Sequence, residues 1–125
     1  MSNLVYTYHF SVGSADTKTV YCIADAPIRL KAVRINSTGL VAHATNAVTL
    51  TVLKGSDTIC SRTTDTDTSG HATLVADTAE NLTLAHQDEL YLNAGEFFKI
   101  TYVATGTVAL NFGVNLHCES ARDLS

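Results

Sequence analysis

The sequence predicts an all-β fold: a two-sheet antiparallel β-sandwich of jelly-roll type with about eight strands. Three observations lead to this prediction. Apolar and polar residues alternate along most of the chain, which is the period of half-buried strands. No long segment has the 3.6-residue apolar stripe of an amphipathic helix. The 125 residues amount to a single domain (1–125), in which strands without intervening helices pack as two sheets. An immunoglobulin-like sandwich is the second choice, because the chain has no Trp.

The first predicted strand covers residues 4–12, in which apolar or aromatic residues occupy every second position. Tyr6 and Tyr8 lie on this apolar face. They can be core residues, exposed rings that stack on sugars, or part of a contact with another subunit. Residues 1–18 can form a strand of the domain or an arm that engages a neighbouring subunit, because the alternating pattern is the same in both cases.

The second and third predicted strands lie on either side of Pro27, the single proline of the chain. Residues 19–24 are apolar on both faces. Along residues 28–35 the apolar positions shift by one residue between Ala32 and Val33. A β-bulge has this effect, because it adds one residue to one strand of a pair. We therefore expect a bulge in the third strand.

The same strand carries the basic cluster of the chain, which consists of Arg29, Lys31 and Arg34. Arg29 and Lys31 share the outer face of a regular strand, and a bulge would bring Arg34 beside them. One interpretation is a solvated edge whose charges prevent pairing with other chains. The other is a basic patch that docks on an acidic protein surface.

The remainder of the chain predicts short strands separated by polar turns, followed by two long strands. Residues 97–104 and 107–117 alternate clearly and are joined by Thr105 and Gly106, so they predict a β-hairpin. Residues 77–81 could form one helical turn. The other predicted strands cover residues 47–54, 58–61, 72–76, 82–85 and 90–92.

One polar segment, residues 62–70, contains no apolar side chain and predicts a solvated loop. Asp65 and Asp67 in this loop are spaced as in the first half of a calcium-binding loop. The second half does not match, because Ala76 stands where a bidentate Glu would complete the coordination shell. The five histidines show no zinc-ligand spacing. We expect no resident metal and keep Asp65 and Asp67 as the candidate pair.

The sequence also lacks the local motifs of catalytic sites. It has no Gly-x-Ser-x-Gly elbow and no phosphate-binding loop. Asp88 and Glu89 are adjacent, so on a strand they would point to opposite faces and could not act as paired carboxylates across a cleft. We expect a protein without enzymatic activity and without a cofactor.

Composition narrows the range of partners. The net charge of −4 disfavours a sequence-independent nucleic-acid binder. Charged residues make up 16% of the chain, against about 25% in ordinary soluble domains, so we expect much of the surface to meet other protein. No apolar run is long enough to span a membrane. The N-terminus does not resemble a secretory signal peptide, so we expect the three cysteines to be reduced.

The order of elements from Tyr21 almost to the end of the chain supports a more specific prediction. The segments that carry it are Ala26-Pro27-Ile28-Arg29-Leu30, the small-residue loop around Gly39, Ala47-Val48-Thr49-Leu50-Thr51-Val52, and residues 81–90 before the terminal strands. In this order the chain resembles the jelly-roll capsid decoration (cement) proteins of tailed bacteriophages.

That resemblance implies a non-enzymatic virion protein that is made in the host cytoplasm and joins the exterior of a phage capsid. Such proteins typically form trimers and clamp adjacent capsomers, so the implied partners are the major capsid protein and further copies of the chain. Arg29, Lys31 and Arg34 are then candidate capsid contacts, and Tyr6 and Tyr8 candidate contacts with a partner. The alternatives are a carbohydrate- or receptor-binding β-module of a tail fibre or spike, and a head-fibre, neck or tail component with the same fold.

Overall fold

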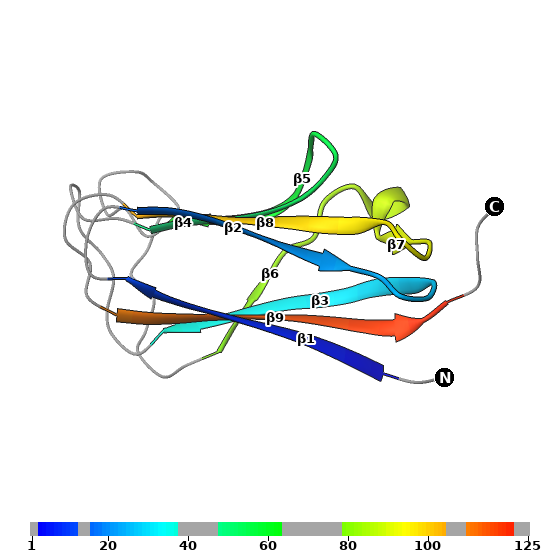
Figure 1. Cartoon of the computed structure of the whole chain (residues 1–125), viewed down its shortest axis with the longest axis horizontal. Coiled ribbons are helices and arrows are strands. Elements are labelled where there is room, and N and C mark those ends of the chain that lie inside the picture. The colour runs from blue at the N-terminus through cyan, green and yellow to red at the C-terminus, as the bar shows by residue number, and fades with distance from the viewer. Residues whose placement is uncertain (1–2, 13–15, 38–47, 64–78, 105–109, 122–125) are drawn as a thin grey trace.

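The structure is a computed structural model of the chain, described over residues 3–12, 16–37, 48–63, 79–104 and 110–121. Its strands form two antiparallel sheets that lie face to face (Figure 1). The predicted β-sandwich is therefore confirmed. No helix within these ranges is long and apolar enough to cross a membrane.

The two sheets have five and four strands. The five-stranded sheet contains β1 (Asn3–Val12), β9 (Leu110–Ser120), β3 (Ile28–Ser37) and β6 (Glu80–Leu82) in this order, with the short β7 (Tyr91–Leu92) also paired to β3. The four-stranded sheet contains β2 (Asp16–Ile23), β8 (Phe97–Ala104), β4 (Val48–Lys54) and β5 (Asp57–Thr63). A 3-10 turn, η1 (Gln87–Glu89), lies between β6 and β7.

The pairing of the strands is that of a jelly roll. With the two-residue β7 set aside, the first strand pairs with the last, β1 with β9, and the next pairs inward are β2 with β8, β3 with β6, and β4 with β5. This nesting is what results when one long antiparallel hairpin is rolled into two sheets. The strand order therefore confirms the predicted jelly-roll topology.

The predicted hairpin between residues 97–104 and 107–117 is wrong. β8 and β9 lie in opposite sheets: β8 pairs with β2 and β4, and β9 pairs with β1 and β3. Alternation of apolar residues shows which face of a strand is buried, but it does not show which strand lies next to it. In this fold consecutive strands mostly change sheets, and the tight hairpin is instead the β4–β5 turn at Gly55, whose φ is +62°.

Three shorter elements also differ from the prediction. The strand expected at 82–85 is β6, which ends at Leu82. The helical turn expected over 77–81 is wrong at its end, because Glu80 and Asn81 belong to β6. Residues 62 and 63, which were expected in a loop, belong to β5, and the rest of the expected loop lies outside the described residues. The strand predicted at 72–76 lies outside the described residues.

The predicted bulge in the third strand is confirmed. The β3–β9 register shifts between Leu30 and Ala32, so Lys31 is the additional residue. Leu30 before the bulge and Val33 after it are both about fully buried. The extra residue is thus what allows the apolar side chains on both halves of β3 to face the same core.

The core lies between the sheets and is built from side chains of every long strand except β1. Each of its large members contributes about 1.5–3 kcal/mol by burial. The largest fully buried side chains are Tyr102, Phe98, Ile28, Leu30, Ile35, Leu50, Ile59, Leu92, Ile100 and Leu116. Three free cysteines, Cys22, Cys60 and Cys118, are buried among them.

Candidate functional site

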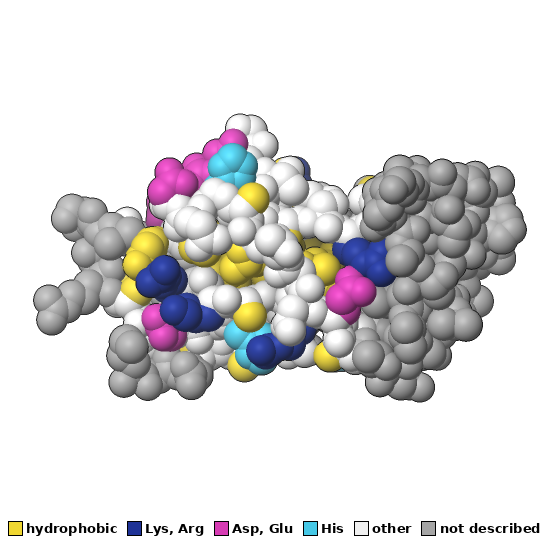
Figure 2. Space-filling view, turned by 180° about the vertical axis from the view of Figure 1, so that it is seen from behind, with side chains coloured by type: hydrophobic (Ala, Val, Ile, Leu, Met, Phe, Trp, Pro, Cys, Tyr) yellow, Lys and Arg dark blue, Asp and Glu magenta, His cyan; other side chains and the backbone are white. Residues whose placement is uncertain are grey.

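The basic cluster lies on the outer face of the five-stranded sheet. Arg29 and Arg34 alternate with buried residues of β3, and Lys31 stands out at the bulge with 47% of its side chain exposed. The structure therefore brings the three predicted residues onto one face. Figure 2, which looks onto the edge of the sandwich opposite β1 and β2, shows Lys and Arg side chains next to apolar ones.

The three basic residues differ in how far their charges are already satisfied. Arg34 donates from Nε to Asn81 Oδ1 at 2.7 Å, and its terminal nitrogen lies 3.0 Å from His117 Nε2. Lys31 Nζ is 3.6 Å from Glu119 Oε1, which is a loose ion pair at a partly exposed site. Arg29 forms no ion pair within the described part of the chain. Its guanidinium instead lies 5.1 Å from the centre of the Tyr91 ring.

A hollow of about 330 Å³ lies beside Arg29 and Lys31. It opens between β3 and the segment that connects β6 to β7. Its lining combines the two cations with apolar and polar side chains. The lining residues are Arg29, Leu30, Lys31, Thr83, Leu84, Gln87 and Leu90.

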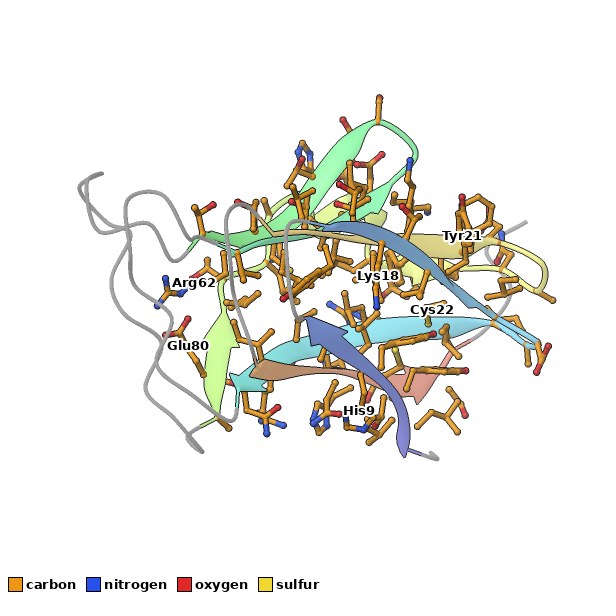
Figure 3. All side chains as sticks on the ribbon, turned by 60° about the vertical axis from the view of Figure 1, so that its left-hand side comes forward. His9, Lys18, Tyr21, Cys22, Arg62 and Glu80 are labelled. Carbon is orange, nitrogen blue, oxygen red and sulfur yellow. The ribbon has the colours of Figure 1, made fainter. Side chains whose placement is uncertain are left out.

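A second surface lies on the outer face of the four-stranded sheet. We call Tyr21, Ile23 and Phe97 the apolar outer patch. Their side chains are 50%, 55% and 44% exposed. Ile23 is directly opposite Phe97 in the β2–β8 register, and the Tyr21 and Phe97 rings meet edge to face with centroids 5.2 Å apart. In Figure 3 Tyr21 points away from the sandwich, whereas Cys22 points between the sheets.

The apolar outer patch was not among the sites predicted from the sequence, although the sequence gives an indication of it. Residues 19–24 are apolar on both faces, which is unusual for a strand at the outside of a sheet. One face, with Cys22, is buried, and the other is the exposed patch. A strand that is apolar on both faces therefore indicates that its outer face can be a contact surface.

Tyr6 and Tyr8 lie at the edge where β1 and β2 face each other. Both rings are half-buried and pack against the core, so they do not form an exposed platform. The Tyr8 hydroxyl donates to the backbone oxygen of Tyr21 at 3.4 Å, and burial raises the pKa of Tyr8 above its ordinary value. Their contact with a partner stays a prediction.

The predicted metal candidates, Asp65 and Asp67, lie outside the described residues. Among the described residues, those that could hold a metal are Asp57, His86 and Glu89, whose ligand atoms all lie within 4.8 Å of one another. A hydrogen bond with the neighbouring Asp57 carboxylate, which favours the protonated form of Glu89, raises the pKa of Glu89. Two carboxylates and one imidazole are ligand types that divalent transition metals accept.

Comparisons with known proteins add nothing to the fold assignment. No family model matches the chain, and no curated protein matches it. A search of solved structures found a chain in the structure of infectious bursal disease virus, Gt strain, with 13% sequence identity and a TM-score of 0.32. The alignment covers 98% of this chain and 37% of the viral one. The fold assignment accordingly rests on the strand order of this chain itself.

Proposed function

We propose that this chain is a non-enzymatic structural protein of a virion, which decorates a phage capsid and stabilises it by binding adjacent capsomers as a trimer. The observation that carries the proposal is the apolar outer patch. Exposed apolar side chains that touch one another mark protein contacts, because single scattered ones are common but contiguous ones are not. The low share of charged residues, 16%, supports the same conclusion.

The jelly-roll topology is compatible with this role, because viral capsid proteins are among the proteins that use it. The same topology also occurs in lectin domains, so the fold alone does not select the function. The resemblance to decoration proteins in the order of elements is what favours the capsid exterior over other locations.

The two surfaces lie on opposite faces of the sandwich and differ in chemistry, and we assign them different partners. The apolar outer patch, with Tyr21 and Ile23 at its centre, is assigned to contacts between copies of this chain, because permanent interfaces between identical subunits are the more apolar ones. The basic cluster is assigned to the major capsid protein, since charge complementarity orients a protein as it docks.

The mechanism follows from mass action. A protein that binds only the mature lattice lowers the free energy of that lattice relative to its precursors and to its dissociated subunits. Trimers that engage several capsomers at once add avidity, because the second and third contacts form at a high effective concentration. No chemical step is required.

Sedimentation tests the proposal directly. We expect a trimer at micromolar concentration by analytical ultracentrifugation, and co-sedimentation with expanded phage heads but not with unexpanded ones. The double variant Tyr21→Ser/Ile23→Ser should be monomeric. Thr19→Ser, which changes an exposed residue of the same strand, should remain a trimer. A monomeric wild type that binds neither kind of head would refute the proposal.

One observation favours a second candidate function, a carbohydrate-binding module of a tail fibre or spike. The exposed ring of Tyr21, which is held edge-on by Phe97, has the size and polarity of a sugar-stacking residue. A glycan array separates the two functions. Binding to a glycan that is lost in Tyr21→Ser would favour the module over the decoration protein.

A further inference from the structure

We propose that the hollow beside Arg29 and Lys31 binds a carboxylate, supplied by a Glu or Asp side chain in an acidic segment of the protein to which this chain attaches. The identity of that protein rests on the proposed function. The chemistry of the site does not, because it follows from the side chains that line the hollow.

The hollow exists because pairing along one edge of β3 is interrupted. β7 pairs with Ile28 and Arg29, and β6 pairs with residues 33–35. Between these two ladders the segment 83–90 leaves β3 and crosses toward the other sheet, where Ala85 N donates to Ile59 O at 2.7 Å. The bulge at Lys31 falls in this gap. An interruption that coincides with a bulge leaves a recess at the outer surface of an otherwise continuous sheet.

The charge inside the recess is incompletely neutralised. Arg29 has no carboxylate partner among the described residues, and its Nε is buried without a hydrogen-bond partner. A buried donor without an acceptor is destabilising, and a suitable acceptor would remove this penalty. Lys31 has only the loose contact with Glu119. Two cations therefore face one hollow in a chain whose net charge is −4.

The shape and lining match a carboxylate on a short apolar stem. Leu84, which is only partly buried, supplies apolar surface against which the methylene groups of a Glu side chain can pack. The side-chain nitrogen of Gln87 donates to Leu84 O at 2.9 Å and so keeps this wall in place. The planar guanidinium of Arg29 is suited to donate two parallel hydrogen bonds to a carboxylate.

The carboxylate is favoured over a larger or more highly charged anion. The volume of about 330 Å³ is at the lower limit of ligand pockets, which suits one side chain better than a nucleotide or an oligosaccharide. Glu119, which contacts Lys31 at 3.6 Å, would repel a doubly charged phosphate more strongly than a singly charged carboxylate.

The test uses the whole protein and a small probe, N-acetyl-glutamate amide, followed by NMR with ¹⁵N-labelled protein. The Arg29 Nε–H signal and the amides of Leu84 and Leu90 should shift together and saturate at millimolar probe. N-acetyl-glutamine amide, which has the same shape without the charge, should cause no saturable shift. Equal shifts with both probes, or none with either, would overturn the proposal.

Variants identify the groups that bind the probe. Arg29→Gln and Lys31→Gln should each weaken binding by about tenfold, since each removes a charge-assisted contact. Lys31→Gln changes a side chain that is about half exposed, so this variant should keep the wild-type fold even if Arg29→Gln is destabilised. Lys99→Gln removes the same charge from the other sheet and should bind as the wild type does. Unchanged binding in both hollow variants would contradict the site.

The two proposals can fail separately. Saturable binding of the probe without any binding to heads would leave the carboxylate site intact and refute the capsid function. Binding to heads that is unaffected by Lys31→Gln, together with no probe binding, would leave the capsid function intact and refute the site.

Discussion

The two long sides of the sandwich are joined in different ways. On the side of β5 and β6, Arg62 of one sheet forms a two-bond ion pair with Glu80 of the other, with nitrogen–oxygen distances of 2.6 and 3.2 Å (Figure 3). Lys54 Nζ adds a bond of 2.7 Å to Tyr91 O between the sheets. On the side of β1 and β2, Tyr8 contacts the opposite edge through a 3.4 Å hydrogen bond to Tyr21 O and through a hydrogen bond with the Cys22 side chain.

This difference lies in the polar contacts between the sheets and not in the strand edges. β1 and β2 each pair with one neighbour among the described strands, and so do β5 and β6 on the other side. On the β5–β6 side the Arg62–Glu80 pair and the Lys54 bond join the two sheets. Unpaired edges are where additional strands attach, and the apolar outer patch begins on β2. The apolar outer patch therefore lies on the side of β2, where we propose contacts between copies of this chain, whereas the hollow proposed to bind a carboxylate lies on the side of β6 and β7.

The largest expected effect compares apolar side chains on the two edges. Ile59 on β5 is fully buried, whereas Val20 on β2 is half-buried. Ile59→Ala should lower the free energy of unfolding by about 3 kcal/mol, and Val20→Ala by about 1 kcal/mol, because the exposed edge loses less contact. Urea unfolding followed by circular dichroism measures both. Equal losses would mean that the two sides are packed alike.

The ion pair gives the next effect. Arg62→Ala should destabilise the protein by about 2 kcal/mol, because it removes hydrogen bonds from a side chain only 12% exposed and leaves Glu80 without its partner. Arg62→Lys keeps the charge but not the two parallel bonds, so its stability should lie between those of Arg62→Ala and the wild type. Thermal unfolding is the measurement, and an unchanged melting temperature in Arg62→Ala would show that the pair does not hold this side together.

Two cysteines extend the comparison to alkaline pH. Burial raises the pKa of Cys60, which lies on β5, to about 12, whereas in the unfolded chain the thiol ionises near 9. Its contribution to stability is therefore complete below pH 9 and is lost as the pH rises toward 12. Between pH 8 and pH 10, the free energy of unfolding of the wild type should fall by about 1 kcal/mol more than that of Cys60→Ala.

Cys22, which lies on β2 at the opposite side of the sandwich, supplies the matched control for Cys60. Burial also raises its pKa, but the hydrogen bond with Tyr8 lowers it again. Cys22→Ala should therefore remove less of the pH dependence than Cys60→Ala, as measured by urea unfolding at both pH values. A larger effect for Cys22→Ala would reverse the comparison.

The smallest effect on stability is expected on the outer surface. Tyr21→Ser/Ile23→Ser should change the free energy of unfolding of the dissociated chain by no more than about 0.5 kcal/mol, because the replaced side chains are about half exposed. Its oligomeric state should nevertheless change. Unfolding and sedimentation of the same sample separate the effect on stability from the effect on the oligomeric state. A strongly destabilised variant would indicate that the patch stabilises the fold and does not serve association.

Much of this architecture was predictable because it depends on local patterning. Alternation marked β1, β3, β4, β8 and β9 as strands, and a one-residue shift marked the bulge. The basic cluster was placed on one face by the same argument. The hollow beside Arg29 was not predictable, since it depends on where the 83–90 segment leaves β3. The apolar outer patch was within reach, because residues 19–24 have no polar face.

The amino-acid pattern by itself determined which side chains face inward, because successive residues of a strand point to opposite faces whatever lies beside it. Only the tertiary structure decided which strands are neighbours. β8 and β9 look like a hairpin and lie in different sheets, and the Arg62–Glu80 pair joins residues 18 positions apart across the sandwich. Such contacts depend on how distant segments meet in space, and a local period of two residues carries no information about that.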